Sequence, residues 1–186
     1  MEKPRIKPKQ GSILISEPSL RDFYFRQSVI LLAEHNEEGT FGVIINKPIE
    51  ARLKDFIQGI SGYNLPVYLG GPVKTDSIFF IHTHAEIENC VPIMQGLYWG
   101  GDLDIIKNML KHKSLSPDEI RFYIGYSGWS PNQLDRELKE KSWVLSQATV
   151  KEVITAHPEN LWSDYLKNMG KDYAIWANFP ADPAFN

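Results

Sequence analysis

RFYIGYSGWSPNQLDRELKEKSWVLS, residues 121–146, carries the strongest local structural signals in the chain. The run of apolar and aromatic residues at 122–126 predicts a strand. Gly125 and Gly128 then predict a turn, because glycine adopts the positive φ angles that tight turns require. We expect this turn to fold Trp129 back onto the sheet.

A helix is predicted to follow this turn. Ser130 can cap the helix, Pro131 fits the first helical position, and Gln133 can reach back to the backbone N–H of Ser130. A second strand is predicted at residues 143–145. The helix would turn Leu134 and Leu138 inward and form two exposed ion pairs, Asp135 with Lys139 and Glu137 with Lys141.

The rest of the sequence predicts more strands in the first half of the chain and more helices in the second. Runs rich in β-branched residues predict strands at 11–16, 28–35, 40–47, 67–69, 77–84 and 120–126. Apolar spacing and capping residues predict helices at 51–58, from Asp102, from Thr149 and at 161–169. Because strands and helices do not alternate regularly, we expect an α+β or α/β fold: a single compact domain around one curved sheet.

Length and composition limit the organisation and the compartment. The 186 residues suit one domain, with residues 1–10 as a basic flexible tail and residues 11–186 as the folded domain. The single cysteine, Cys90, excludes an internal disulfide and favours a reducing cytoplasm. No segment has the roughly 18 to 20 apolar residues of a membrane span, and the N-terminus lacks the apolar core of a signal peptide. We expect a cytoplasmic protein with no membrane interaction.

The charge distribution argues against direct DNA binding. The formal net charge is −3, and because the first ten residues carry +3, the remainder carries −6. A DNA-binding domain needs a basic surface that neutralises phosphates. We therefore expect a protein or small-molecule partner, whose identity the sequence leaves open.

Two histidines make a metal site an alternative. His82 and His84 are two residues apart on a predicted strand, so their side chains would share one face, as two zinc ligands do. A third ligand is needed, and Glu34, His35 or Glu86 could supply it. The competing interpretation is two polar residues near the end of a strand, because no HExxH motif or cysteine pair is present.

The glycine-rich segments partly resemble two known kinds of loop, the nucleophile elbow and the anion-binding glycine loop, but match neither. Residues 125–128, GYSG, lack one residue of the G-x-S-x-G nucleophile elbow, in which Ser127 would be the nucleophile. The pairs at 70–71 and 100–101 could bring backbone N–H groups to an anion, but Asp102 would repel phosphate. No GxGxxG or P-loop motif is present, so we expect no cofactor.

Several long segments give a family resemblance over nearly the whole chain from Gly11. They are GSILISEPSLRDFYFRQSVILLAEH (11–35), GTFGVIINKP (39–48), YLGGPV (68–73) and RFYIGYSGWSPNQLDREL (121–138). In this order they resemble the AlgH/YqgE family of bacterial proteins. The family pattern near the glycines looks like GYAGWGPGQLE, from which Ser127, Ser130, Asn132 and Asp135 are conservative departures.

The resemblance implies a compact α/β or α+β fold with a bent, partly barrel-like mixed sheet flanked by helices, in a soluble cytoplasmic bacterial protein. It brings no established reaction and no catalytic residues. Members of the family are often labelled transcriptional regulators. The acidic body of this chain does not support direct DNA binding, so regulation through a protein partner stays open.

Together, the residues and the resemblance favour a non-enzymatic binding or regulatory protein. The alternative is a small-molecule enzyme or metal-binding protein that uses His82 and His84, with Ser127 and Asp102 as further polar candidates. A cleft that joins the two histidines to a carboxylate would favour the alternative, and a shallow apolar patch would favour the binding protein. The ligand contacts that we expect are Gly70, Gly71, Gly101, Asp102, Ser127 and Trp129.

Overall fold

The structure is a computed structural model that describes residues 7–60, 64–155 and 157–180. Residues 1–6 of the expected basic tail therefore lie outside the described residues. The strands are β1 (Ser12–Ser16), β2 (Val29–Asn36), β3 (Gly39–Ile44), β4 (Pro48–Arg52), β5 (Pro66–Leu69), β6 (Val73–His82), β7 (Val91–Met94), β8 (Leu97–Trp99), β9 (Ile120–Trp129) and β10 (Trp143–Gln147). The helices are α1 (Leu103–Lys111), α2 (Gln133–Lys139), α3 (Val150–Thr155), α4 (Leu161–Asn168) and α5 (Lys171–Ala174), with 3-10 turns at Leu53–Asp55, Pro117–Glu119, Pro158–Asn160 and Trp176–Asn178.

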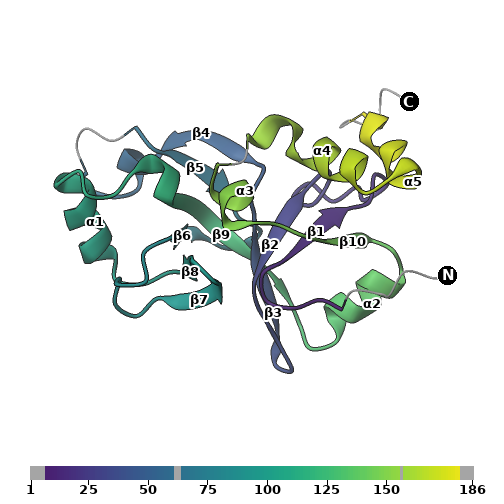
Figure 1. Ribbon diagram of the computed structural model, residues 1–186, viewed down its shortest axis with the longest axis horizontal. Coiled ribbons are helices and arrows are strands. Elements are labelled where there is room, and N and C mark those ends of the chain that lie inside the picture. The colour runs from purple at the N-terminus through teal and green to yellow at the C-terminus, as the bar shows by residue number, and fades with distance from the viewer. Residues whose placement is uncertain (1–6, 61–63, 156, 181–186) are drawn as a thin grey trace.

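The strands form one mixed sheet with two halves that meet at β9 (Figure 1). Along the main path the order is β10-β1-β2-β3-β9-β6-β8-β7, and β5, which also pairs with β4, joins β9. The β5–β9 pair is parallel, whereas the other described pairs are antiparallel. Among the described strands β10 and β7 do not pair with each other, so the sheet stays open.

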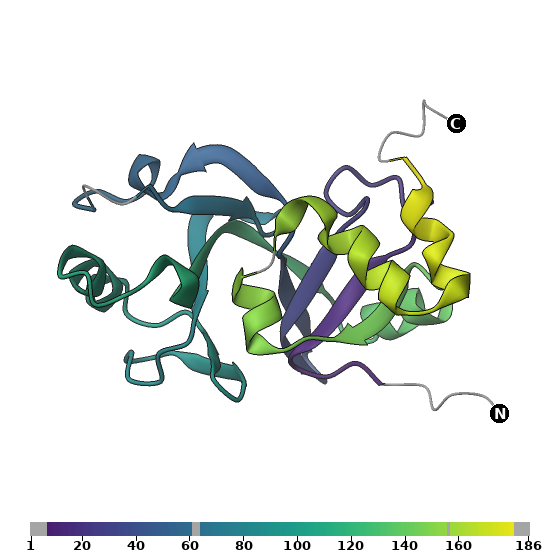
Figure 2. The ribbon, with the colours of Figure 1, turned by 45° about the horizontal axis from the view of Figure 1, so that its top comes forward.

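Strands β1, β2 and β3 lie in the first half of the sheet, on the β10 side of β9. They are buried on both faces, which explains their continuous apolar runs. Ile13 and Ile15 of β1 belong to one core, which includes Trp162 of α4. Leu14 between them belongs to another core, which includes Leu134 of α2. Figure 2 shows α4 and α5 lying across one face of β1 and β2. The alternation of side chains along a strand therefore separates two helix-covered cores.

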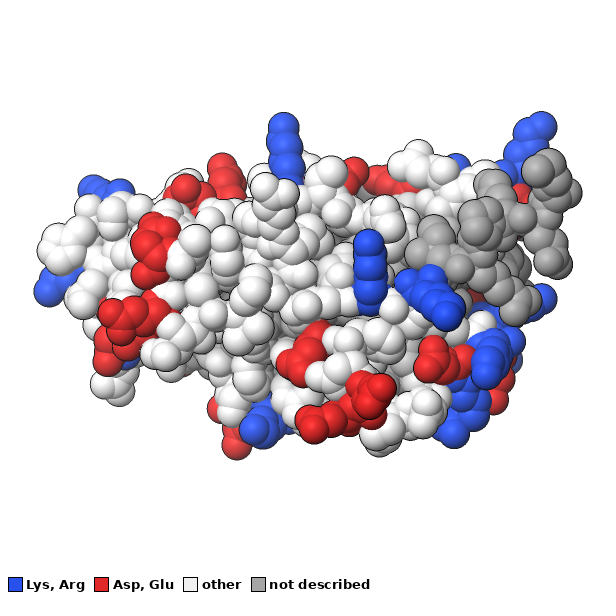
Figure 3. Space-filling view, turned by 60° about the horizontal axis from the view of Figure 1, so that its bottom comes forward, with Lys and Arg blue, Asp and Glu red and all other residues white. Residues whose placement is uncertain are grey.

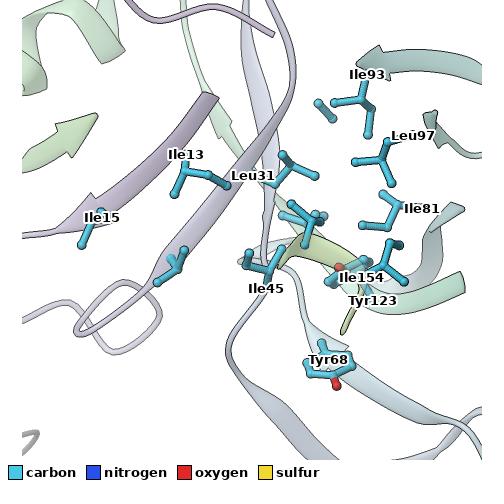
Figure 4. Close-up of a cluster of buried hydrophobic side chains, with 14 of the residues drawn as sticks. Ile13, Ile15, Leu31, Ile45, Tyr68, Ile81, Ile93, Leu97, Tyr123 and Ile154 are labelled. Atoms are coloured by element: carbon cyan, nitrogen blue, oxygen red, sulfur yellow. The ribbon is translucent and has the colours of Figure 1, made fainter. Parts of the chain in front are cut away.

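The core under α4 also joins the two halves of the sheet. In Figure 4, Ile13 and Leu31 lie across from Ile93 and Leu97 of the β7–β8 hairpin. Tyr123 of β9 is fully buried in the same core. The second half has a further core of its own beneath α1, which contains Phe80, Ile106, Leu110 and Phe122.

The predicted turn at residues 125–128 is wrong, because β9 continues to Trp129. The last residues of β9 pair with β3, with Gly128 opposite Phe41 and Trp129 opposite Thr40. Gly125 has a φ angle of 67°, which is accommodated within the strand, where the pairing with β6 also shifts register. The G-x-S-x-G comparison therefore fails structurally, since a nucleophile elbow needs a turn between strand and helix.

The predicted helix at 51–58 is also wrong. Residues 48–52 form β4, in which Pro48 pairs with Tyr68 and Arg52 pairs with Pro66, and a single 3-10 turn follows. Leu53 is buried, but Phe56 is 43% exposed. Pairing with a distant strand therefore overrides the local helical spacing.

The capping predictions at Asp102 and Thr149 are confirmed, whereas the one at Ser130 is wrong. Asp102 accepts a hydrogen bond from the backbone N–H of Asp104 at 2.8 Å. Glu152 accepts one from the backbone N–H of Thr149 at 2.6 Å. Gln133 accepts the predicted hydrogen bond from the N–H of Ser130 at 2.9 Å. However, α2 begins at Gln133 behind Asn132, which has a positive φ angle, so Ser130 does not cap the helix and Pro131 is not its first residue.

The fold class is confirmed as a single α+β domain with a bent, open sheet flanked by helices. In the described part of the chain, no helix has the length and apolar character required to cross a membrane.

Candidate functional site

An open groove lies between the β2–β3 hairpin and strands β6, β8 and β9. Its volume is about 570 Å³. The groove is lined by Glu34, Asn36, Glu38, Gly39, Thr40, Phe41, Val73, Phe79, Trp99, Tyr126, Gly128, Trp129, Ser130 and Pro131.

Four aromatic rings, each only partly buried, form a connected group in this groove. Phe41 meets Trp99 edge to face at a centroid distance of 5.3 Å and Tyr126 at 5.9 Å. Phe79 stacks on Trp99 at 5.5 Å and meets Tyr126 edge to face, also at 5.5 Å. Ring faces carry partial negative charge and attract cations. We call Phe41, Phe79, Trp99 and Tyr126 the aromatic group.

The groove also carries negative charge. Glu34 and Glu38 line it, and none of the described residues that line it is lysine or arginine. Asn36 orients this hairpin, since its side chain donates to Glu34 Oε1 at 2.5 Å and accepts from the N–H of Glu38 at 2.9 Å. Carboxylates beside aromatic faces favour a cationic ligand.

Trp129 is among the lining residues, but its buried indole packs in the core beneath α2, where a carboxylate fixes it. Glu137 Oε2 accepts the indole N–H of Trp129 and that of Trp143, each at 2.8 Å. Gln133 donates to the other carboxylate oxygen at 2.9 Å. The expected exposed pair of Glu137 with Lys141 is therefore wrong, because the carboxylate turns toward the two indoles.

Ser127 and Gly70 lie at a crossing of three strands rather than at a surface. The fully buried Ser127 hydroxyl donates to the Gly70 carbonyl oxygen at 3.0 Å, and the N–H of Ile44 donates to the same oxygen at 2.9 Å. A Cβ on Gly70 would lie 2.2 Å from the Gly125 oxygen. Glycine is thus required because the backbones touch.

The other expected contacts are spread over the fold. Gly71 packs against Tyr126 and Ser127, and Gly101 packs against Ile87. Asp102 is occupied as the cap of α1. Of the six expected ligand contacts only Trp129 lines the groove, and ligand contact at all six stays a prediction.

The two histidines lie close together but do not share a strand face, because β6 ends at His82. Fully buried His82 has both ring nitrogens engaged: Nε2 lies 2.8 Å from the Gly100 carbonyl oxygen, and Nδ1 accepts the N–H of His84 at 3.2 Å. His84 Nδ1 lies 2.7 Å from Glu86, and its Nε2 lies 3.4 Å from Glu119.

The environments of these histidines shift their pKa values in opposite directions. Burial lowers the pKa of His82. Burial also opposes the charge of His84, but the hydrogen bond with Glu86 and the nearby carboxylate of Glu119 outweigh it and raise the pKa of that ring. Within the described ranges, no group of three or more His, Cys, Asp or Glu residues is arranged to hold a metal ion. Metal binding by His82 and His84 stays a prediction.

Known proteins are similar to this chain in both sequence and fold. A family model described as AlgH-like matches residues 13–174. The chain belongs to the AlgH-like family. A UPF0301 protein of Bacteroides thetaiotaomicron is 42% identical over 182 residues, which cover 97% of this AlgH-like chain and 93% of the relative. A UPF0301 protein of Cytophaga hutchinsonii is 38% identical and covers 95% and 98% of the two chains.

Two solved structures resemble this AlgH-like chain along almost its whole length. The AlgH protein from Pseudomonas aeruginosa has a TM-score of 0.73 and 25% identity, with 96% of this chain and 97% of that chain covered. Protein DIP2367 from Corynebacterium diphtheriae has a TM-score of 0.78 and 24% identity, with 95% of each chain covered. The second likeness concerns the fold alone.

Sequence reasoning did not identify the aromatic group of this AlgH-like chain. Its rings come from β3, β6, β8 and β9, and they meet only because strands distant in the sequence pair with one another. No local periodicity carries that signal. Glu34 was considered only as a metal ligand, and the structure places it in the groove instead.

Proposed function

We propose that this AlgH-like chain is a non-enzymatic binding protein that recognises a cationic segment of a partner protein in the groove. The observation that carries the proposal is the aromatic group beside the carboxylates of Glu34 and Glu38. A cation over an aromatic face is stabilised by about 0.5 to 2 kcal/mol, and arginine can also bond a carboxylate through two N–H groups. The occupant is therefore a segment that presents arginine or lysine.

The proposed role is regulatory and cytoplasmic, with any effect on transcription exerted through the partner. The open groove suits side chains of a peptide better than a small substrate that must be enclosed. Ser127 is buried and bonded to backbone, which also supports a role without catalysis. Figure 3 shows a face with a largely uncharged centre and with acidic and basic side chains mainly toward its edges, and such mixed charge supports a protein partner over DNA.

Calorimetry with a blocked Gly-Arg-Gly-Arg-Gly peptide tests the proposal. We expect saturable binding that weakens roughly tenfold when citrulline, a neutral analogue of the same shape, replaces arginine. The double variant Glu34→Gln with Glu38→Gln should lose a similar factor. A matched control, Glu50→Gln with Glu140→Gln, changes two exposed carboxylates outside the groove and should bind like the parent protein. Equal affinity for the two peptides would refute the proposal.

A further inference from the structure

A second cavity, of about 620 Å³, lies on a different part of the molecule from the groove. It is formed where the loop before β2 and the start of β4 meet the segments around α4 and the last 3-10 turn. Its lining residues include two cations, Arg26 and Lys47, and one carboxylate, Glu159. Its volume is within the range of pockets that hold small organic ligands.

The backbone on both sides of Lys47 is fixed by hydrogen bonds. Asn46 accepts the N–H of Val29 at 2.8 Å and donates to the carbonyl of Gln27 at 2.9 Å. The carbonyl of Lys47 accepts the N–H of Leu69 at 2.8 Å. The Lys47 ammonium donates to the carbonyl of Tyr24 at 2.5 Å, which leaves two of its three donors for other partners. The ammonium is therefore held in place at the cavity.

The positive charge at this wall is not balanced by an ion pair. In the part of the chain that the structure describes, neither Lys47 nor Arg26 lies within ion-pair distance of a carboxylate. Burial, followed by repulsion from Arg26, lowers the pKa of Lys47 to about 8, although Asp22 acts in the opposite direction. The ammonium is thus still mostly charged at pH 7. Among the residues that line the cavity there are two cations and one carboxylate, which favours a ligand with a single negative charge.

The remaining walls are largely apolar. Trp162 is buried, and Ile49, Phe23 and Phe179 also line the cavity. The side chain of Gln27 donates to the carbonyl of Phe179 at 2.9 Å and so ties the C-terminal wall to the loop before β2. Phe23 and Phe179 are 71% and 43% exposed, so they offer aromatic surface in the same cavity as the two cations.

We propose that this cavity binds a small organic carboxylate with a flat apolar body. The carboxylate lies between Lys47 and Arg26, and the body packs against Phe23 and Phe179. This inference is independent of the groove, because the two cavities share no lining residue.

Calorimetry with naphthoate tests this inference, with its neutral amide, naphthamide, as the matched ligand. We expect naphthoate to bind at pH 7 and naphthamide to bind roughly tenfold or more weakly. Lys47→Met should weaken naphthoate binding by a similar factor, whereas Lys111→Met, which removes an exposed lysine on α1, should not. Lys47→Arg keeps the charge and should retain binding.

A pH comparison tests the same site without removing the cation. Raising the pH from 7 to 9 should weaken naphthoate binding to the parent protein, because Lys47 loses its proton near pH 8. Binding to the Lys47→Arg variant should change little over this range. If circular dichroism shows that Lys47→Met does not fold, the pH comparison between the parent protein and Lys47→Arg is the deciding test. Equal binding of naphthoate and naphthamide, unchanged binding by a folded Lys47→Met variant, or no binding at millimolar naphthoate would overturn the inference.

Discussion

Ser127 donates a hydrogen bond to the carbonyl oxygen of Gly70 across the crossing of β9 and the end of β5, with an Oγ–O distance of 3.0 Å. The hydroxyl is fully buried, so its loss leaves the bond unmade in the interior. We expect Ser127→Ala to lower the free energy of unfolding by about 1 to 2 kcal/mol in urea titrations. Ser114→Ala, at an exposed serine, should change it little. A fully stable Ser127→Ala variant would show that the bond contributes nothing.

Gly70 should tolerate no side chain. An added Cβ would lie 2.2 Å from the carbonyl oxygen of Gly125 and 3.1 Å from the Cβ of Tyr123, and neither atom is the movable end of a flexible side chain. We expect Gly70→Ala to destabilise the protein by about 3 kcal/mol or more, or to prevent folding. Gly128→Ala, on the neighbouring strand β9, is the matched control, because the nearest atom to its Cβ would be at an ordinary 3.5 Å. The melting temperatures of the two variants should differ clearly. Similar melting temperatures would contradict the close approach of Gly70 to the Gly125 backbone.

Glu137 should matter more than an exposed helix residue usually does. Replacement by alanine removes the acceptor of two indole N–H groups, those of Trp129 and Trp143. We expect Glu137→Ala to cost about 2 to 4 kcal/mol of unfolding free energy and to change the near-UV circular dichroism of the tryptophans. Glu140→Ala, one turn along on the exposed surface, should leave both unchanged. Equal behaviour of the two variants would disprove the role of Glu137.

His84 should make stability depend on pH. Its pKa is raised in the folded state, so its contribution is fully present below the unfolded value of about 6.5 and is lost as the pH rises through the folded pKa. Replacement of His84 by glutamine should therefore destabilise the protein at pH 5.5 and have a smaller effect at pH 8.5, as measured by urea unfolding.

His82, next to His84, makes stability depend on pH in the opposite direction. Burial lowers its pKa, so its contribution is present above about 6.5 and is lost as the pH falls toward the folded pKa. The parent protein alone would therefore mix the two effects, which is why the difference between parent and variant is compared at each pH. A loss on His84→Gln that is larger at pH 8.5 than at pH 5.5 would contradict the assignment.

The parts of the fold that could be predicted depend on local chemistry. Strands β1 to β3 follow from apolar runs, and the turns before α1 and α3 follow from Asp102 and Thr149, whose caps involve residues only two or three positions away. The errors arose where a distant strand decides the conformation. Residues 127–129 stay extended because they pair with β3, and residues 48–52 form a strand because they pair with β5.

The site was harder to predict for the same reason. Trp129 was identified, but its neighbours in the groove come from strands far apart in the sequence. Lys47 ends a run that looks like an ordinary strand, and only the folded chain places Arg26 and Trp162 around it. Gly70 and Ser127 were expected at a ligand, and their positions have a structural explanation in the strand crossing.

The most direct test of the groove follows the indole N–H signals of the five tryptophans by NMR while the arginine peptide is added. Trp99 lies in the aromatic group, whereas Trp162 and Trp176 lie outside the groove. We predict that the Trp99 signal shifts and saturates with the peptide, and that the Trp162 and Trp176 signals stay in place. Saturable binding that moves Trp162 or Trp176 and leaves Trp99 unchanged would contradict the account.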